Sequence, residues 1–147
     1  MTSRGFAQFV GILFIAVGLL GFVPGVKSIP PVGSAPGLVV EQGFGHLFGL
    51  FPVNWVHNLV HLGVGVTALY SARSMASSRQ FARGLTWFYG VLAVMGLFPV
   101  LNVTFGLIPI YGHDIWLHAL TAAGAAYFGF GRRAELLESA ERYRRAA

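Results

Sequence analysis

The chain has 147 residues, of which 55% are hydrophobic and only 10% are charged, and its mean hydropathy is +0.67. About a quarter of the residues of a soluble domain are charged, so this composition excludes an ordinary soluble domain and indicates a single membrane domain. The absence of cysteine excludes disulfide frameworks and thiol–disulfide relays. The net charge is +5, and the basic residues are confined to certain segments. Membrane topology explains this distribution better than binding to nucleic acid does.

The first apolar segment covers residues 5–23 and is predicted to be a transmembrane helix. Its length of about 19 residues suffices to cross a hydrocarbon core of about 30 Å. Arg4 followed by an apolar run is also typical of a signal peptide, but the run is long and no A-x-A site follows it. We therefore expect a retained helix. Small residues follow one side of it and predict close helix packing: Ala7, Gly11, Gly18 and Gly21.

Three further transmembrane helices are predicted over residues 53–72, 84–101 and 113–131. Residues 26–38 are rich in proline and glycine and are expected to form an ordered external loop. Residues 42–52 have apolar side chains at helical spacing but are too few to span, which predicts an interfacial or re-entrant turn over the bundle. Aromatic residues are expected in belts at the two interfaces, namely Trp55 and Trp116 outside and Trp87, Tyr89 and Tyr127 inside.

Residues 73–83 form a short basic connection, and residues 132–147 are expected to form an amphipathic helix on the membrane surface. That helix would have an apolar edge made of Leu136, Leu137, Ala140 and Tyr143. Nine arginines lie on one side of this topology, whereas Lys27 lies on the other. The positive-inside rule therefore predicts that both termini are cytoplasmic, in a bacterial cytoplasmic or thylakoid-type membrane.

The two halves of the chain resemble each other. GLLGFVPG ends the first helix and VMGLFPVL ends the third, while HNLVHLGVGVTALYSAR in the second resembles DIWLHALTAAGAAYFGF in the fourth. Two helical hairpins of the same orientation would be related by an axis along the membrane normal. His57 would then face Asp114, and His61 would face His118 one helical turn deeper.

Each pair, His57 with His61 and Asp114 with His118, has the i, i+4 spacing that places two side chains on one helix face. These four residues are predicted to form an external polar pocket, with Asn58 beside it and residues 42–52 above it. No serine or cysteine nucleophile stands in a recognisable setting nearby, so we assign no catalytic residue. Polar residues do not continue through the membrane, which disfavours transport.

The pattern allows three interpretations of this cluster. Buried polar side chains between membrane helices are often only hydrogen-bonding links. Three histidines and one carboxylate also suffice to bind zinc or non-haem iron. A haem or another tetrapyrrole could instead be ligated by His61 and His118 at equal depth.

Several motifs resemble one family of bacterial membrane proteins, that of domain of unknown function 4383. They are VPG near the end of the first helix, LFGLFPVNWVHNLVHLGVG at the second and a D-x-W-L-H element that opens the fourth. The resemblance covers most of residues 4–131 and implies a four-helix integral membrane protein, with no activity attached. It gives no role to His46 or His113.

We therefore expect an all-α membrane protein, an antiparallel bundle of four transmembrane helices built from two repeated hairpins, with a cytoplasmic C-terminal helix. The predicted function is that of a small structural or accessory protein whose helices are locked by the buried His/Asp cluster. The alternative is a redox or sensing protein that binds a metal ion or haem through His57, His61, Asp114 and His118. Its partners would be the lipid bilayer and a larger complex or a second copy of the chain.

Overall fold

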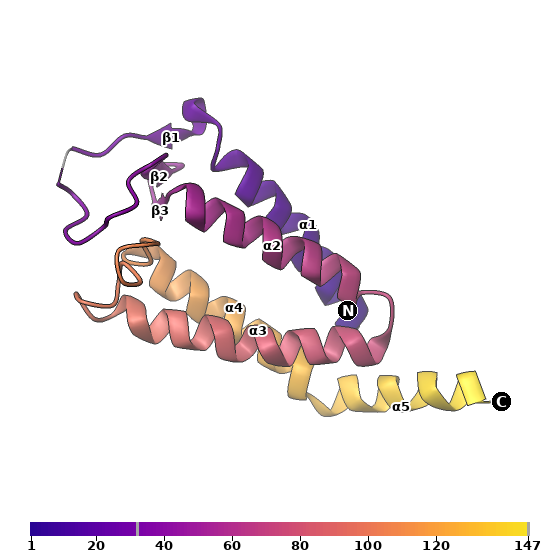
Figure 1. The fold of residues 1–147 in the computed structure, drawn as a ribbon. Helices are drawn as coiled ribbons and strands as arrows, with labels where there is room; N and C mark the ends of the chain where they lie inside the picture. Colours follow the sequence, from indigo (N-terminus) through magenta and orange to yellow (C-terminus); the bar gives the residue numbers. More distant parts are fainter. Residues whose placement is uncertain (32, 147) are drawn as a thin grey trace.

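The computed structural model describes residues 1–31 and 33–146, and among them four long helices form two antiparallel hairpins (Figure 1). A fifth helix follows at the end where the N terminus lies. This arrangement confirms the all-α class. The hairpins are α1 (Ser3–Leu20) with α2 (Trp55–Ser71) and α3 (Met75–Gly96) with α4 (His113–Phe130), and the fifth helix is α5 (Arg132–Ala146).

By length and composition, α1 is the one helix of the described chain that is long and apolar enough to cross a membrane. The helix α2 has only 17 residues, and α3 opens with a polar turn. Large apolar side chains are nevertheless exposed on each of the four long helices, for example Phe9, Leu59, Val91 and Leu120. Exposed apolar surface on this scale marks an interaction with lipid or protein.

The third helix differs most from its predicted range of 84–101. It begins at Met75, where the side chain of Ser74 caps the first turn, and it ends at Gly96. Residues 73–83 were predicted to be a basic connection, but most of them are helical. Their arginine Arg79 can be buried there because it donates to a backbone carbonyl of α4 at 3.0 Å. At the other end, Pro99 disfavours helical backbone in the residue before it.

A short antiparallel sheet joins α1 to α2. Residues 42–52, predicted from helical spacing to be an interfacial or re-entrant turn, contain a β-hairpin and no helix. Phe48 and Gly49 both have positive φ angles, 54° and 74°, which reverse the chain between two strands. A 3₁₀ turn (Pro24–Val26) leads into the sheet, whose strand order is β1 (Lys27–Ser28), β2 (Gly45–Leu47) and β3 (Phe51–Val53).

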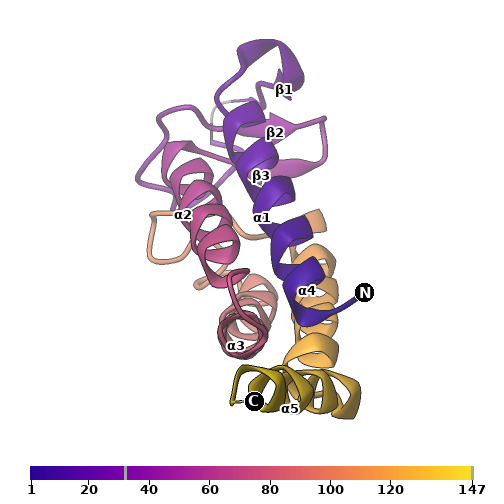
Figure 2. The same ribbon diagram turned by 90° about the vertical axis from the view of Figure 1, so that its right-hand side faces the viewer.

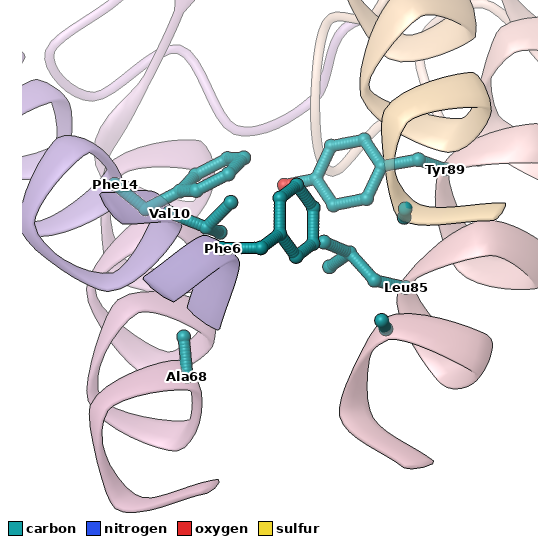
Figure 3. Packing of buried hydrophobic residues seen from close by; sticks show 8 residues of the cluster. Phe6, Val10, Phe14, Ala68, Leu85 and Tyr89 are labelled. Carbon is teal, nitrogen blue, oxygen red and sulfur yellow. The ribbon is translucent and has the colours of Figure 1, made fainter. Parts of the chain in front are cut away.

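Aromatic side chains join the two hairpins in the core. The ring of Phe14 lies 5.5 Å from that of Tyr89, and Phe6 stacks on Phe128 with 4.7 Å between ring centroids. Figure 3 shows Phe6 and Phe14 projecting from α1 toward Tyr89 of α3. Each such pair stabilises the fold by about 0.5–1.5 kcal/mol beyond its area burial.

The position of Tyr89 corrects a prediction. It was expected among the aromatic residues of the inner interface, but it is 2% exposed and belongs to the core. Because α3 begins at Met75 rather than near residue 84, Tyr89 lies well inside the helix instead of near its start.

The helices α1 and α2 approach closely through glycines. A Cβ atom at Gly65 would lie 2.9 Å from the carbonyl oxygen of Gly11, and one at Gly11 would lie 3.0 Å from that of Gly65. A Cβ atom at Gly21 would lie 2.0 Å from the side chain of Asn58. The stripe of small residues predicted on α1 is therefore a face that packs against α2.

Basic residues gather at the end of the bundle that holds the N terminus. Arg4 donates to the carbonyl of Ala72, just after α2, at 3.0 Å. At the same end, α5 is held by an ion pair of 2.9 Å between Arg79 and Glu138, and Arg142 pairs with the same carboxylate. The residues that α5 buries against the bundle are Ala134 and Glu138, whereas Leu136 and Tyr143 of its predicted apolar edge are exposed.

The glycine contact predicts opposite effects for two neighbouring substitutions. Replacing either Gly63 or Gly65 by alanine gains about 1 kcal/mol of helix propensity. A Cβ atom at Gly63 meets nothing within 4 Å, but at Gly65 it meets backbone atoms of α1. In detergent we expect Gly65→Ala to lower the melting temperature and Gly63→Ala to leave it unchanged or raise it. Equal melting temperatures for the two variants would contradict the close approach.

The α5 contact predicts a loss of stability in acid. The hydrogen bond from Arg79 is the main cause that holds the pKa of Glu138 below its usual 4.5. A lowered folded-state pKa stabilises the protein above the unfolded-state value, and this contribution disappears as pH falls through the folded-state value. Melting temperature should therefore fall below about pH 4.5 more steeply in the wild type than in Glu138→Gln. Glu135→Gln is the matched control, because that side chain is 63% exposed. If the melting temperature of both variants fell with pH as steeply as that of the wild type, the role of Glu138 would be contradicted.

Candidate functional site

The first turn of α2 is fixed by Asn54, which is fully buried. Its side-chain oxygen accepts from the backbone N–H of His57 at 2.8 Å and caps the helix. Its amide nitrogen donates to the carbonyls of Val40 and Leu107 at 2.8 and 2.7 Å. One side chain thus ties the start of α2 to the connections before α2 and before α4, and it fixes the position of His57.

The described structure brings His57, Asp114 and His118 together between the two hairpins. Each offers one ligating atom, and these atoms lie within 4.8 Å of one another. All three residues are buried, at 2–3% exposure. Nδ1 of His57 lies 4.0 Å from Oδ2 of Asp114, and the His57 and His118 ring centroids are 6.4 Å apart.

His57 has a defined orientation. Its Nδ1 lies 3.1 Å from the carbonyl oxygen of Pro52, at the β-hairpin. A carbonyl oxygen only accepts hydrogen bonds, so Nδ1 carries the proton and Nε2 keeps its lone pair. A histidine that binds metal commonly donates its second ring nitrogen to a backbone carbonyl in this way.

The other polar atoms of the cluster have no hydrogen-bond partner among the described residues. They are Oδ2 of Asp114, Nδ1 of His61, Nδ1 of His118 and both amide atoms of Asn58. More than nine in ten buried polar groups in proteins are hydrogen-bonded, so several unpartnered atoms in one place need an explanation. Two imidazoles and one carboxylate are a donor set that fits zinc or non-haem iron.

The model of the family described as Domain of unknown function (DUF4383) matches residues 4–131. The chain belongs to this family. Comparison with curated proteins and with solved structures found no match. The matched range runs from the first turn of α1 past the end of α4, so the hairpins and the cluster between them are parts of the DUF4383 domain.

Within the DUF4383 domain, the four predicted site residues are neighbours, and one of the two predicted pairs is present. His57 does face Asp114. His61 and His118 were expected to face each other, whereas the ring of His61 lies 4.5 Å from His57 and 5.2 Å from Phe14. The ring of His118 lies 5.1 Å from Tyr89. His61 is therefore next to the three-residue group, in contact with His57, and is not one of the three residues whose ligating atoms lie within 4.8 Å of one another.

The two remaining histidines lie outside the cluster. Nδ1 of His113 accepts from the indole N–H of Trp116 at 3.0 Å, and His113 is exposed. The ring of His46 lies 6.4 Å from that of Tyr111, whose hydroxyl is itself buried without a partner among the described residues. Burial raises the pKa of Tyr111, with a smaller contribution from Asp114, so this hydroxyl stays protonated.

A cleft of about 410 Å³ borders the cluster. Its walls come mainly from α1, α4 and the β2–β3 hairpin, and α2 contributes His61; the carboxylate that lines it is that of Asp114. Residues 42–52 were expected to lie over the polar pocket, and Leu47, Phe48 and Phe51 of the hairpin line this cleft. The sequence did not indicate the cleft itself, because four separate segments form it.

Proposed function

We propose that this DUF4383 protein is an integral membrane protein in which α1–α4 cross a bacterial cytoplasmic membrane as an antiparallel four-helix bundle. At 1.5 Å per residue, helices of 17–22 residues are about 25–33 Å long, close to the thickness of a hydrocarbon core. The apolar side chains exposed along all four helices support this placement.

The distribution of charge supports a cytoplasmic location for both termini. Contacts of Arg4, Arg79 and Glu138 join the N terminus, the start of α3 and α5 at one end of the bundle. Lys27 belongs to β1, at the opposite ends of the helices (Figure 1). An excess of arginine at one end is the pattern of a cytoplasmic face.

We also propose that the bundle binds one divalent metal ion through His57, Asp114 and His118. The observation that carries this proposal is that two helices, α2 with His57 and α4 with Asp114 and His118, place buried donor atoms within 4.8 Å of one another. Ligands around a tetrahedral ion with bonds of about 2.1 Å lie about 3.4 Å apart, so small side-chain rotations would close the site. Three protein ligands leave a further coordination position for a small molecule.

The predicted helix lock is the second candidate. In this interpretation the His57–Asp114 couple joins α2 to α4 without a metal, and the protein serves as an accessory subunit or a homo-oligomer. The separation of 4.0 Å between the two side chains supports an electrostatic contact. It is longer than a hydrogen bond, and the unpartnered atoms around it favour the metal.

Labelling of engineered cysteines tests the topology, because the natural chain has none. Ser34 lies in the loop before α2 and Ser139 in α5, and both are exposed. A membrane-impermeant maleimide should label Ser34→Cys in spheroplasts but should label Ser139→Cys only after the membrane is opened. The reverse pattern would invert the topology, and equal labelling of both variants in closed spheroplasts would exclude it.

Metal analysis of the purified protein tests the site. We expect about one zinc, iron or manganese ion per chain, and a lower melting temperature after chelation, since a ligand bound only to the folded state stabilises it. Asp114→Asn and His118→Ala should lose the ion, whereas His113→Ala, which lies outside the cluster, should keep it.

Variants of the other two histidines of the cluster separate the candidates. A metal-free protein whose melting temperature is insensitive to chelator but falls in His57→Ala would support the helix lock and refute the metal site. Loss of the ion in His61→Ala would restore the predicted four-residue site. A Soret band in the visible spectrum would favour the haem alternative with His61 and His118.

A further inference from the structure

The cleft of about 410 Å³ beside the cluster joins two kinds of surface. Its rim includes Phe9, Leu13, Phe48 and Leu120, which are 45–62% exposed. Its inner wall includes His61 and Asp114, which are buried. Figure 2 faces the side where α1, α4 and the hairpin come together. In the membrane placement proposed above, this cleft opens sideways into the bilayer.

The polar end of the cleft needs a hydrogen-bonding occupant. Oδ2 of Asp114 and Nδ1 of His61 are buried and have no partner among the described residues. A carboxylate oxygen accepts a hydrogen bond from a hydroxyl group, and an imidazole nitrogen can donate or accept according to its tautomer. A purely hydrocarbon occupant would leave both atoms unpaired.

The charges around the cleft restrict the head group of the occupant. Among the described residues that line it, none is lysine or arginine, and Asp114 is the one carboxylic acid. Phosphate and carboxylate head groups require cationic partners or several donors, so phospholipids and fatty acids fit poorly. A neutral head group with hydroxyl or carbonyl oxygens fits.

The side chains near the polar end favour a ring. Phe14 and Phe51 line the cleft, and Phe14 lies 5.2 Å from the ring of His61. Aromatic rings stack or pack edge to face on other rings. The cleft volume lies within the range of about 300–1,000 Å³ that holds a single small ligand.

We infer that the cleft between α1, α4 and the β2–β3 hairpin binds a quinol-type lipid. Its oxygen-bearing ring lies against His61 and Asp114, and its hydrocarbon tail leaves along Leu13 and Leu120 toward the bilayer. The inference concerns binding only. His61 is not one of the three proposed metal ligands, so it offers the ring a hydrogen bond with or without a metal at His57, Asp114 and His118.

A glycine offers a way to fill the cleft without displacing backbone. Gly124 lines it, and a Cβ atom there would have Phe6 Cε2 at 3.9 Å as its nearest heavy atom. Gly124→Leu should therefore occupy the cleft. Gly63→Leu is the matched control, because it adds the same side chain to an exposed helical position with nothing within 4 Å.

The test is calorimetric titration of the purified protein in nanodiscs with a decyl-tailed benzoquinol. We expect Gly124→Leu to weaken binding about tenfold or more, by filling the space that the ring and tail need. His61→Ala should weaken it about three- to tenfold through loss of one hydrogen bond. Gly63→Leu should bind like the wild type.

Several outcomes would overturn the inference. Wild-type affinity in Gly124→Leu, with an unchanged melting temperature, would place the ligand elsewhere. Decanoic acid that binds as tightly as the quinol, and is equally sensitive to Gly124→Leu, would make the cleft a general acyl-chain site. Metal content measured on the same samples keeps the two proposals apart, since Gly124→Leu should retain any ion that the wild type binds.

Discussion

The arrangement of the polar cluster depends on the hydrogen bonds made by one buried side-chain amide, that of Asn54. Asn54 caps the first turn of α2 and donates two hydrogen bonds to the connections before α2 and before α4. Without these bonds the fully buried amide nitrogen of Asn54 would be unpaired, at a cost of about 1–3 kcal/mol. The same turn presents His57 to the carbonyl of Pro52, so the orientation of the imidazole follows from the anchoring of the helix.

Periodicity predicted the features that repeat along a single helix. The i, i+4 pairs of histidine and aspartate residues do share helix faces, and the small residues of α1 do pack against α2. Features that depend on neighbours in space were missed. Residues 42–52 have apolar side chains at helix-like spacing, but two strands and a turn carry them, and of Leu47 and Phe48 in this series one is buried and the other exposed. The early start of α3 depends on partners for Arg79 that lie in α4 and α5.

In the candidate site, too, the sequence predicted what repeats along one helix but not what depends on neighbouring helices. The internal repeat expected from the sequence predicts the depth of each polar residue, but such a repeat does not fix the rotation of each helix about its own axis. Here His61 turns toward Phe14 and stacks near His57, while His118 turns toward Tyr89. Three donors therefore meet instead of two facing pairs. Tyr89 could not be recognised as part of the site, since a tyrosine in an apolar segment is equally typical of an interface.

Polar side chains are hydrogen-bonded at one end of the bundle and lack hydrogen-bond partners at the other. This contrast supports a bound ligand at the second end. At the basic end, Arg79 and Arg83 both donate to the carbonyl of Gly129, and Arg79 also pairs with Glu138. At the opposite end, the buried atoms of Asp114, His61 and His118 have no partner among the described residues. Because the polar groups at the basic end are paired within the protein, we infer that the unpaired atoms at the other end have their partner in a bound group. The donor atoms lie close together, and the carbonyl of Pro52 fixes the tautomer of His57. An apolar cleft lies beside them. This is the arrangement expected of a site that binds a ligand.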